Sequence, residues 1–512
     1  MIKNNIVKGF SWLVFGSLVS KALGGFYKIF LTRIIGGENL GIFNQILSIY
    51  TFFVLFVSAG LPTAMSKLIA KYDSLEHKVK CLKSVLKIFI YISIFISICL
   101  VVVSFYLSHY KGNLTIQSCY FILAPAIVFS SMTAIIKGYF QAENNFKPSA
   151  ISQIVEQLIK IIIGLLFCYL FKSFGAYVQI LIAVFAIASA DFAIFLILYF
   201  SFKKHINFKI KGKLELKVLK QLFNIVFPIM LASLILPFSQ MIDSLLVVKL
   251  LSRNFSVDAS IYLYGLQSGV VATLINLPTV VTFALSSVLM PLLTRDYEKG
   301  NMEGYNKKIT LAVKIIISFA VPCVIFVLFY PDKIINLLYK NKLSGYGING
   351  EMLTSKLLFW SAMNILFLCG SQFLSICLQA QDKKYLPAFN NLMGVIIKFI
   401  LEIVFIPSIK INILAYTLAS TIGYFVIFAL NVYEILKSCE IKIDKRFWTK
   451  LCFINIVVIS FSLLFMLIND SAIGFLITII FSVVIYIVLI FILKLFKKSE
   501  INLIIKNNSI NN

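Results

Sequence analysis

Two lysines near the start of the chain, Lys21 and Lys28, lie inside an apolar stretch where cations are not expected. Residues 10–35 are apolar enough to cross a bilayer, and a cation at the centre of such a span costs about 2.5–3.5 kcal/mol on insertion scales. Seven residues make about two helical turns, so both ammonium groups fall on one helix face. Gly24 and Gly25 between them let a backbone or a ligand come close. This pattern favours a polar cavity that binds an anion over lysines that only reach for the interface.

Two pairs of opposite charges stand four residues apart inside other apolar stretches. Glu156 and Lys160 form one pair, and Lys398 and Glu402 form the other. Residues four apart are neighbours on a helix, so each pair can neutralise itself. The alternative is that the same charges line the cavity, because ionisable residues at membrane depth mostly face a bundle interior. The residues alone leave both interpretations open.

Asp243 differs from these pairs because no basic residue lies three or four positions away from it. A carboxylate at membrane depth needs a partner on another helix, for which Lys21 and Lys28 are the natural candidates, or it holds a cation. Asp243 therefore suits cation coupling.

Helices that cross a membrane must position these residues. Of the 512 residues, 60 % are hydrophobic and 13 % are charged, and the mean hydropathy is +0.95. This composition excludes a soluble domain of that size. The predicted fold is an all-α polytopic membrane protein with fourteen transmembrane helices. The predicted spans are residues 10–35, 40–66, 87–108, 115–140, 149–171, 175–201, 222–248, 262–290, 309–330, 355–380, 386–407, 411–436, 450–469 and 472–494.

Prolines interrupt or end the second, seventh and eighth of these spans. Broken helices leave backbone groups exposed, which is tolerated only where they face protein or a water-filled cavity. The first, second, seventh and eighth spans are therefore predicted to line the cavity.

The net charge of +26 comes mainly from lysines in short loops between the apolar stretches. This distribution is a topology signal and argues against a nucleic-acid-binding surface. Alternate loops are rich in basic residues: 67–87 carries six, 203–220 seven and 437–450 five. The intervening loops carry fewer. Because positively charged loops stay inside the cell, both termini of this multi-pass protein are predicted to be cytoplasmic.

An internal repeat divides the predicted spans into two parallel sets. The segment from Gln141 to Lys160 matches the segment from Gln379 to Lys398, and the two join equivalent spans. Parallel repeats generally flank a central substrate path, and alternating access moves one half against the other. The predicted organisation is a six-helix bundle at 1–201, a basic amphipathic cytoplasmic linker at 202–221, a second six-helix bundle at 222–436, two further helices at 437–494 and a cytoplasmic tail at 495–512.

The sequence predicts no metal site, no disulfide and no cofactor. The nine cysteines include no C-x-x-C pair, and the three histidines form no H-E-x-x-H array. The expected partners are a substrate and the membrane lipids.

Four motifs carry a resemblance to a known family. They are Ser-Lys-Ala-Leu-Gly-Gly-Phe-Tyr-Lys at 20–28, Gly-Glu-Asn-Leu-Gly-Ile-Phe at 37–43, Gly-Leu-Pro-Thr-Ala-Met-Ser-Lys at 60–67, and a segment at 138–157 that begins Gly-Tyr-Phe-Gln-Ala. The chain resembles the stage V sporulation protein B group, in the polysaccharide-transporter branch of the MOP superfamily. That superfamily also contains the lipid II flippases and the MATE drug exporters. The resemblance extends over essentially the whole chain.

The resemblance implies a bundle of fourteen helices around a central cationic cavity. It also implies a flippase, with no covalent chemistry, that moves an undecaprenyl-diphosphate-linked sugar for peptidoglycan, spore-cortex or polysaccharide synthesis, alongside cell-wall synthesis proteins as partners. Lys21 and Lys28 would hold the diphosphate. The family usually has arginine at both positions, and lysine keeps the charge but lacks the bidentate fork.

Two other functions fit these residues less well. An ion-coupled, MATE-like exporter of cationic small molecules would need an acidic, aromatic cavity, which two cavity lysines oppose. A membrane polymerase or transferase of lipid-linked sugars would need a sizeable external loop or a cluster of catalytic carboxylates. The longest predicted external segment, 331–354, has only Asp332 and Glu351 as acidic residues.

Overall fold

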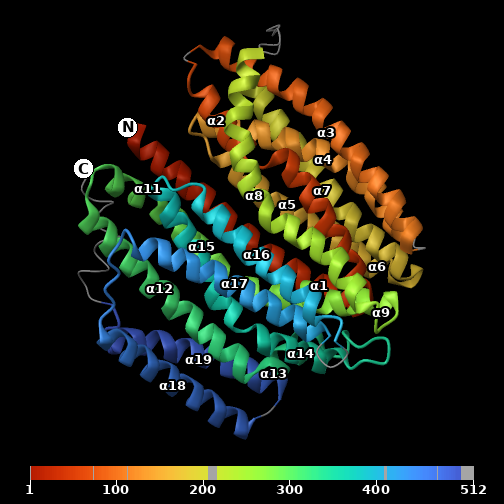
Figure 1. The fold of residues 1–512 in the computed structure, drawn as a ribbon, viewed down its shortest axis with the longest axis vertical. Coiled ribbons are helices and arrows are strands. Elements are labelled where there is room, and N and C mark those ends of the chain that lie inside the picture. The colour runs from red at the N-terminus through yellow and green to blue at the C-terminus, as the bar shows by residue number, and fades with distance from the viewer. Residues whose placement is uncertain are drawn as a thin grey trace. The chain divides into compact units, whose positions relative to one another are not determined.

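The computed structural model describes residues 2–72, 74–111, 114–205, 216–408, 412–469 and 471–496. Within these ranges the regular structure is helical, and the described residues form no strand, only an isolated bridge between Gly345 and Ile348. The all-α fold class is therefore confirmed (Figure 1). The middle of the predicted linker, 206–215, and the predicted tail from residue 497 onward lie outside the described residues.

The helices follow the apolar stretches, because in lipid each backbone polar group must be satisfied within its own segment. In the first half they are α1 (Ile2–Ser58), α2 (Leu61–Ile69), α3 (Leu75–Lys111), α4 (Leu114–Ala142), α5 (Lys147–Ile159), the π-helix η1 (Lys160–Phe167), α6 (Cys168–Leu170), the 3₁₀-helix η2 (Lys172–Phe174), α7 (Ala176–His205), α8 (Leu216–Leu251), α9 (Val257–Gly265), the π-helix η3 (Leu266–Val271) and α10 (Ala272–Asn276). In the second half they are α11 (Thr279–Glu298), α12 (Met302–Phe329), α13 (Pro331–Tyr339), α14 (Gly350–Ser361), α15 (Met363–Ala380), α16 (Leu386–Phe405), α17 (Ile413–Leu436), α18 (Lys445–Ile468) and α19 (Ala472–Ile492).

Among the described residues, twelve helices are long and apolar enough to cross a membrane. A thirteenth crossing results if the bent pair Val257–Asn276 and Thr279–Glu298 is one span; the two helices differ in direction by 49°. The chain is thus a multi-pass membrane protein. The exact number of fourteen crossings stays a prediction.

The helices pack into two compact units. One unit contains the described residues up to Thr273, together with Lys342–Ile348 and the described residues between Ile403 and Ile413; the other contains the rest. This division by packing differs from the predicted division after residue 201, which rests on the sequence repeat. The repeat layout stays a prediction.

In the first unit, α1 packs against α4, α5, α7, α8 and α9. Glycine makes these contacts close. A Cβ atom on Gly16 would lie 2.9 Å from the Ala150 backbone, and one on Gly41 would overlap the Ile261 carbonyl group. Small residues let helix backbones approach in this way, which favours association in a membrane. Other helices of the first unit therefore pack closely against α1 on several sides.

A kink at Gly36 divides α1. This residue has φ +79°, a left-handed conformation that glycine adopts without strain. The following amide, that of Gly37, donates a hydrogen bond of 3.0 Å to the carbonyl of Lys342, and the Tyr262 hydroxyl donates one of 2.5 Å to the carbonyl of Leu343. The segment Lys342–Ile348 therefore packs onto the kink within the first unit.

In the second unit, α15 packs against both α11 and α12, and α18 packs along α19. The Lys308 ammonium reaches across from α12 to the Asp296 carboxylate at the end of α11, at 2.5 Å, and both side chains are almost fully buried. The neighbouring residue Lys307 pairs with Glu303, one turn earlier on α12, and this i,i+4 pair is exposed.

Candidate functional site

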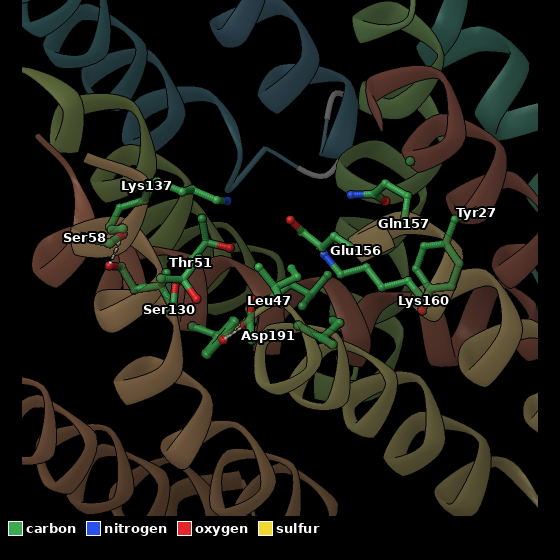
Figure 2. A pocket seen from close by; sticks show the side chains of 18 of the residues that line it. Tyr27, Leu47, Thr51, Ser58, Ser130, Lys137, Glu156, Gln157, Lys160 and Asp191 are labelled. Atoms are coloured by element: carbon green, nitrogen blue, oxygen red, sulfur yellow. Dashed lines mark hydrogen bonds and ion pairs between the residues drawn. The ribbon is translucent and has the colours of Figure 1, made fainter. Parts of the chain in front are cut away.

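A cavity of about 470 Å³ lies within the first unit, among α1, α2, α4, α5, η1 and α7 (Figure 2). Its charged lining residues are Lys28, Lys137, Lys160, Glu156 and Asp191. The predicted seventh and eighth spans contribute none of the described lining residues. The predicted first and second spans contribute α1 and Pro62 of α2.

Helical spacing brings the polar side chains to the cavity. On α4, Ser130, Thr133 and Lys137 follow one another at three and four residues, which places them on one face. On α1, Gly24 and Lys28 do the same. These residues of the cavity lining are therefore positioned by helices and not by loops.

The wall formed by α5 continues into the π-helix η1 at Lys160. A π-helix is rare and often occurs at functional sites. The Tyr27 ring packs against Gly164 of η1, where a Cβ atom would come within 2.7 Å of the ring. The side-chain oxygen of Gln157 lies against Gly24, 3.3 Å from where a Cβ would be. These contacts join α1 to α5 and η1 with little space between them.

Both carboxylates of the cavity have a close partner. The Lys160 ammonium lies 2.6 Å from the Glu156 carboxylate, which is the i,i+4 ion pair that the spacing allowed. The Tyr50 hydroxyl donates a hydrogen bond of 2.7 Å to Asp191. The negative charges of the cavity are therefore already engaged.

Of the three lysines that line the cavity, two have no close partner for their ammonium groups within the described part of the chain. Among the described residues, the side chains of Lys28 and Lys137 show no hydrogen bond and no ion pair within 4 Å. Glu156 and Asp191 act on Lys137 electrostatically, but each has a nearer partner. Three lysines against two carboxylates leave an excess of positive charge, which suits an anionic ligand.

The residues predicted from the sequence are divided by the structure. Lys28, Gly24, Glu156 and Lys160 meet at this cavity. Five other predicted residues lie outside its described lining: Lys21, exposed on α1; Gly25, next to Gly24; Asp243, buried on α8; and the pair Lys398 and Glu402 on α16 of the second unit. Their functional roles stay predictions.

Lys398 and Glu402 do form an ion pair. The Lys398 ammonium lies 3.6 Å from the Glu402 carboxylate and 5.4 Å from the centre of the Tyr416 ring. The self-neutralising arrangement that the spacing allowed is therefore present on α16 as well as at Glu156 and Lys160.

The sequence interpretation missed Lys137 and the Tyr50–Asp191 hydrogen bond. Lys137 lies near the end of the predicted span 115–140, where a lysine usually serves as a topology signal. The signal that could have identified it is the spacing of Ser130, Thr133 and Lys137 on one face of an otherwise apolar helix. The Tyr50–Asp191 contact joins α1 to α7, and no local pattern predicts it.

The fold and the cavity define a multi-pass membrane protein with a charged internal site. Residues 6–296, more than half of the chain, match the model of the polysaccharide biosynthesis protein family, and the chain belongs to that family.

Two curated relatives are similar over most of their length. Stage V sporulation protein B of Bacillus subtilis (strain 168) is 23 % identical, with 98 % of each chain covered. The lipid II flippase MurJ of the same organism is 23 % identical, with 83 % of this chain and 81 % of the relative covered. Among solved structures, the lipid II flippase MurJ in an inward closed conformation superposes with a TM-score of 0.71 at 20 % identity, covering 94 % of this chain and 97 % of that one. This structural similarity is evidence for the fold alone.

Proposed function

We propose that the chain is a flippase that carries an undecaprenyl-diphosphate-linked sugar, similar to lipid II, across the cytoplasmic membrane by alternating access. The observation that carries the proposal is the cavity of the first unit, in which both carboxylates have close partners and the Lys28 ammonium has no hydrogen bond or ion pair among the described residues. A diphosphate offers oxygens that accept hydrogen bonds from such a group. Membership of the polysaccharide biosynthesis family and the lipid II flippase among the relatives support the choice of substrate.

In this proposal the lipid tail stays in the bilayer and the polar head group passes through the protein. Lys28 holds phosphate oxygens, and Gly24 leaves room beside it. Lys21 lies two turns away on α1 and assists from outside the described cavity lining. The reaction makes and breaks no covalent bond. The driving force is the membrane potential or an ion gradient, and each charge moved is worth about 2.3 kcal/mol per 100 mV.

The proposed topology has fourteen crossings with both termini inside. The helix from Trp12 to Ile69 contributes two of them, because 58 residues exceed the roughly 20 that one crossing needs. The kink at Gly36 is then the turn between the two. The bent pair around Pro278 contributes one crossing. The fourteen helices are then grouped into two bundles of six, as the sequence repeat predicts, and two further helices.

Exchanging Lys28 tests the function. Lys28→Ala is expected to reduce translocation of lipid II in reconstituted vesicles at least tenfold, since a charge-assisted hydrogen bond is worth about 1.5–3 kcal/mol. The double variant with Lys21→Ala is expected to abolish translocation. Incorporation into the vesicles should be unchanged. Lys203→Gln serves as control, because this exposed lysine lies at the end of α7 and not in the cavity. Normal transport by the double variant would contradict the site.

A MATE-like exporter of cations has less support. Such a ligand would need a carboxylate that is available to it, whereas Glu156 and Asp191 are both engaged by close partners. If purified protein bound cationic dyes but no lipid diphosphate, this alternative would replace the flippase.

A further inference from the structure

One face of α4 gathers polar groups at the cavity that the proposed function has not used. Ser130, Thr133 and Lys137 all line the cavity from this face. In Figure 2, Lys137, Thr51, Ser58 and Ser130 lie toward one end, whereas Glu156, Gln157, Lys160 and Tyr27 lie toward the other. The cavity therefore has an end with a cation and several hydroxyl groups, apart from the end that holds the Glu156–Lys160 pair.

The Thr133 hydroxyl is buried, with the residue 7 % exposed, and it has no hydrogen-bond partner among the described residues. A threonine inside a helix usually satisfies its hydroxyl on a carbonyl one turn earlier. A buried polar group left without a partner costs about 1–3 kcal/mol, and native proteins retain few of them. Because Thr133 also lines the cavity, its hydroxyl is available to donate a hydrogen bond to a ligand there.

Lys137 stands one turn further along the same face. Its ammonium has neither a hydrogen bond nor an ion pair within the described part of the chain, although it lines a cavity that contains two carboxylates. Those carboxylates are held by Lys160 and by Tyr50. The ammonium of Lys137 is therefore available to bind a ligand at this end of the cavity.

The backbone holds this face of α4 in place. A Cβ atom on Gly138 would lie 2.8 Å from the carbonyl oxygen of Pro62 and 2.5 Å from the Cβ of Met65. The next residue, Tyr139, has a buried ring that packs against Phe202 of α7. Lys137 is thus carried by a helix locked on two sides, which limits how far its ammonium must be ordered when a ligand binds.

We infer that Lys137 and Thr133 form a second anion-binding subsite of the cavity, which holds phosphate oxygens of the substrate in addition to Lys28. One ammonium and one hydroxyl, both donors, match the acceptor oxygens of a diphosphate. The inference rests on the proposed function for the identity of the ligand. It adds α4 as a helix that touches the head group.

Binding by purified full-length protein in detergent tests the inference, with undecaprenyl diphosphate as the probe. Lys137→Gln is expected to weaken binding about tenfold or more, since it removes a charged donor. Lys137→Arg should keep most of the affinity. Thr133→Val, which has the same shape without the hydroxyl, should weaken binding severalfold. Its unfolding temperature should stay equal or rise, because an unsatisfied hydroxyl is removed.

The matched control is Lys147→Gln. Lys147 is an exposed lysine at the start of α5, with its ammonium over the Trp12 ring and outside the cavity lining. Its affinity for the probe should equal that of the wild type. Inorganic diphosphate alone forms a second arm. If it competes with the lipid, and the competition weakens by the same factor in Lys137→Gln, the subsite contacts the phosphate groups themselves.

The possible failures are distinguishable. If the wild type binds the lipid diphosphate and translocates lipid II, but Lys137→Gln and Thr133→Val bind as well as the wild type, the second subsite is overturned and the flippase stands. A lower unfolding temperature for Thr133→Val with unchanged affinity would make the hydroxyl structural and also overturn the subsite. If the wild type neither binds the lipid diphosphate nor translocates lipid II, the proposed function fails and the inference fails with it.

Discussion

At the scale of single residues, the cavity separates charges that serve the fold from charges available to a ligand. Glu156 and Lys160 lie 2.6 Å apart on neighbouring turns, and Tyr50 holds Asp191. Replacing one member of a buried charged pair leaves the other uncompensated, which costs more than the pair itself contributes. The same reasoning predicts that a single substitution at Glu156 lowers the stability of the protein, and that a second substitution at Lys160 restores most of it.

Glu156→Gln is expected to lower the free energy of unfolding by about 1–3 kcal/mol, because Lys160 loses its partner in a partly buried site. The double variant Glu156→Gln with Lys160→Met should recover most of this loss. Thermal unfolding in detergent measures both. A double variant less stable than the single one would show that Lys160 has a second role in holding the unit together.

Sequence reasoning reached part of this site and missed part of it for a physical reason. Lys28 and the Glu156–Lys160 pair were predictable, because a charge far inside an apolar span is costly and calls for an explanation. Lys137 lies five residues before the end of α4, where a lysine usually serves as a topology signal. Only the direction of its side chain separates the two roles, and that direction depends on the packing of α4 against α2 and α7.

At the scale of helices, α11 and α12 carry two ion pairs that differ mainly in burial. Lys308 and Asp296 are almost fully buried and join the two helices, whereas Lys307 and Glu303 are exposed on α12. Exposed pairs contribute little, because water already solvates both partners. A buried pair that loses one member leaves an uncompensated charge. The two adjacent lysines therefore provide an internal comparison.

Asp296→Asn is expected to lower the free energy of unfolding by about 3 kcal/mol, and Glu303→Gln to lower it far less. Raising the salt concentration should reduce the small effect of Glu303→Gln further, since exposed pairs are screened. Thermal unfolding of the three proteins in one detergent measures the difference. Equal effects would mean that the Asp296 contact is solvated in solution.

The helices themselves were predictable, while the packing of one connecting segment was not. The apolar stretches gave the all-α class because long apolar runs have few other structures in a membrane. The segment Lys342–Ile348 has no such pattern. It packs onto the Gly36 kink through backbone carbonyls, which every residue has, so the sequence holds no local sign of the contact.

At the scale of the whole molecule, the predicted orientation assigns each loop to one side of the membrane. Lys307 lies at the start of α12 and Lys340 follows α13, on opposite sides in that prediction. The assignment rests on the distribution of basic residues between alternate loops. Labelling from one side therefore tests the topology independently of transport.

A cysteine at Lys340 is expected to react with a membrane-impermeant maleimide in intact cells, and a cysteine at Lys307 only after the cells are permeabilised. The background for both is Cys452→Ser, because Cys452 is an exposed native thiol. Both positions are exposed in the structure. Reaction of the Lys307 cysteine in intact cells would reverse the proposed orientation.

The contact at the Gly36 kink also has a consequence for biosynthesis. Residues 342–348 are made about 300 residues after Gly37, which at roughly 5–20 residues per second is a delay of about 15–60 s. During that interval the amide of Gly37 lacks the carbonyl group that it binds in the finished protein, and the Tyr262 hydroxyl, made 81 residues before Leu343, lacks its acceptor for the last part of it. In the proposed topology, the first turn of the chain is therefore completed only after more than half of the chain has been made.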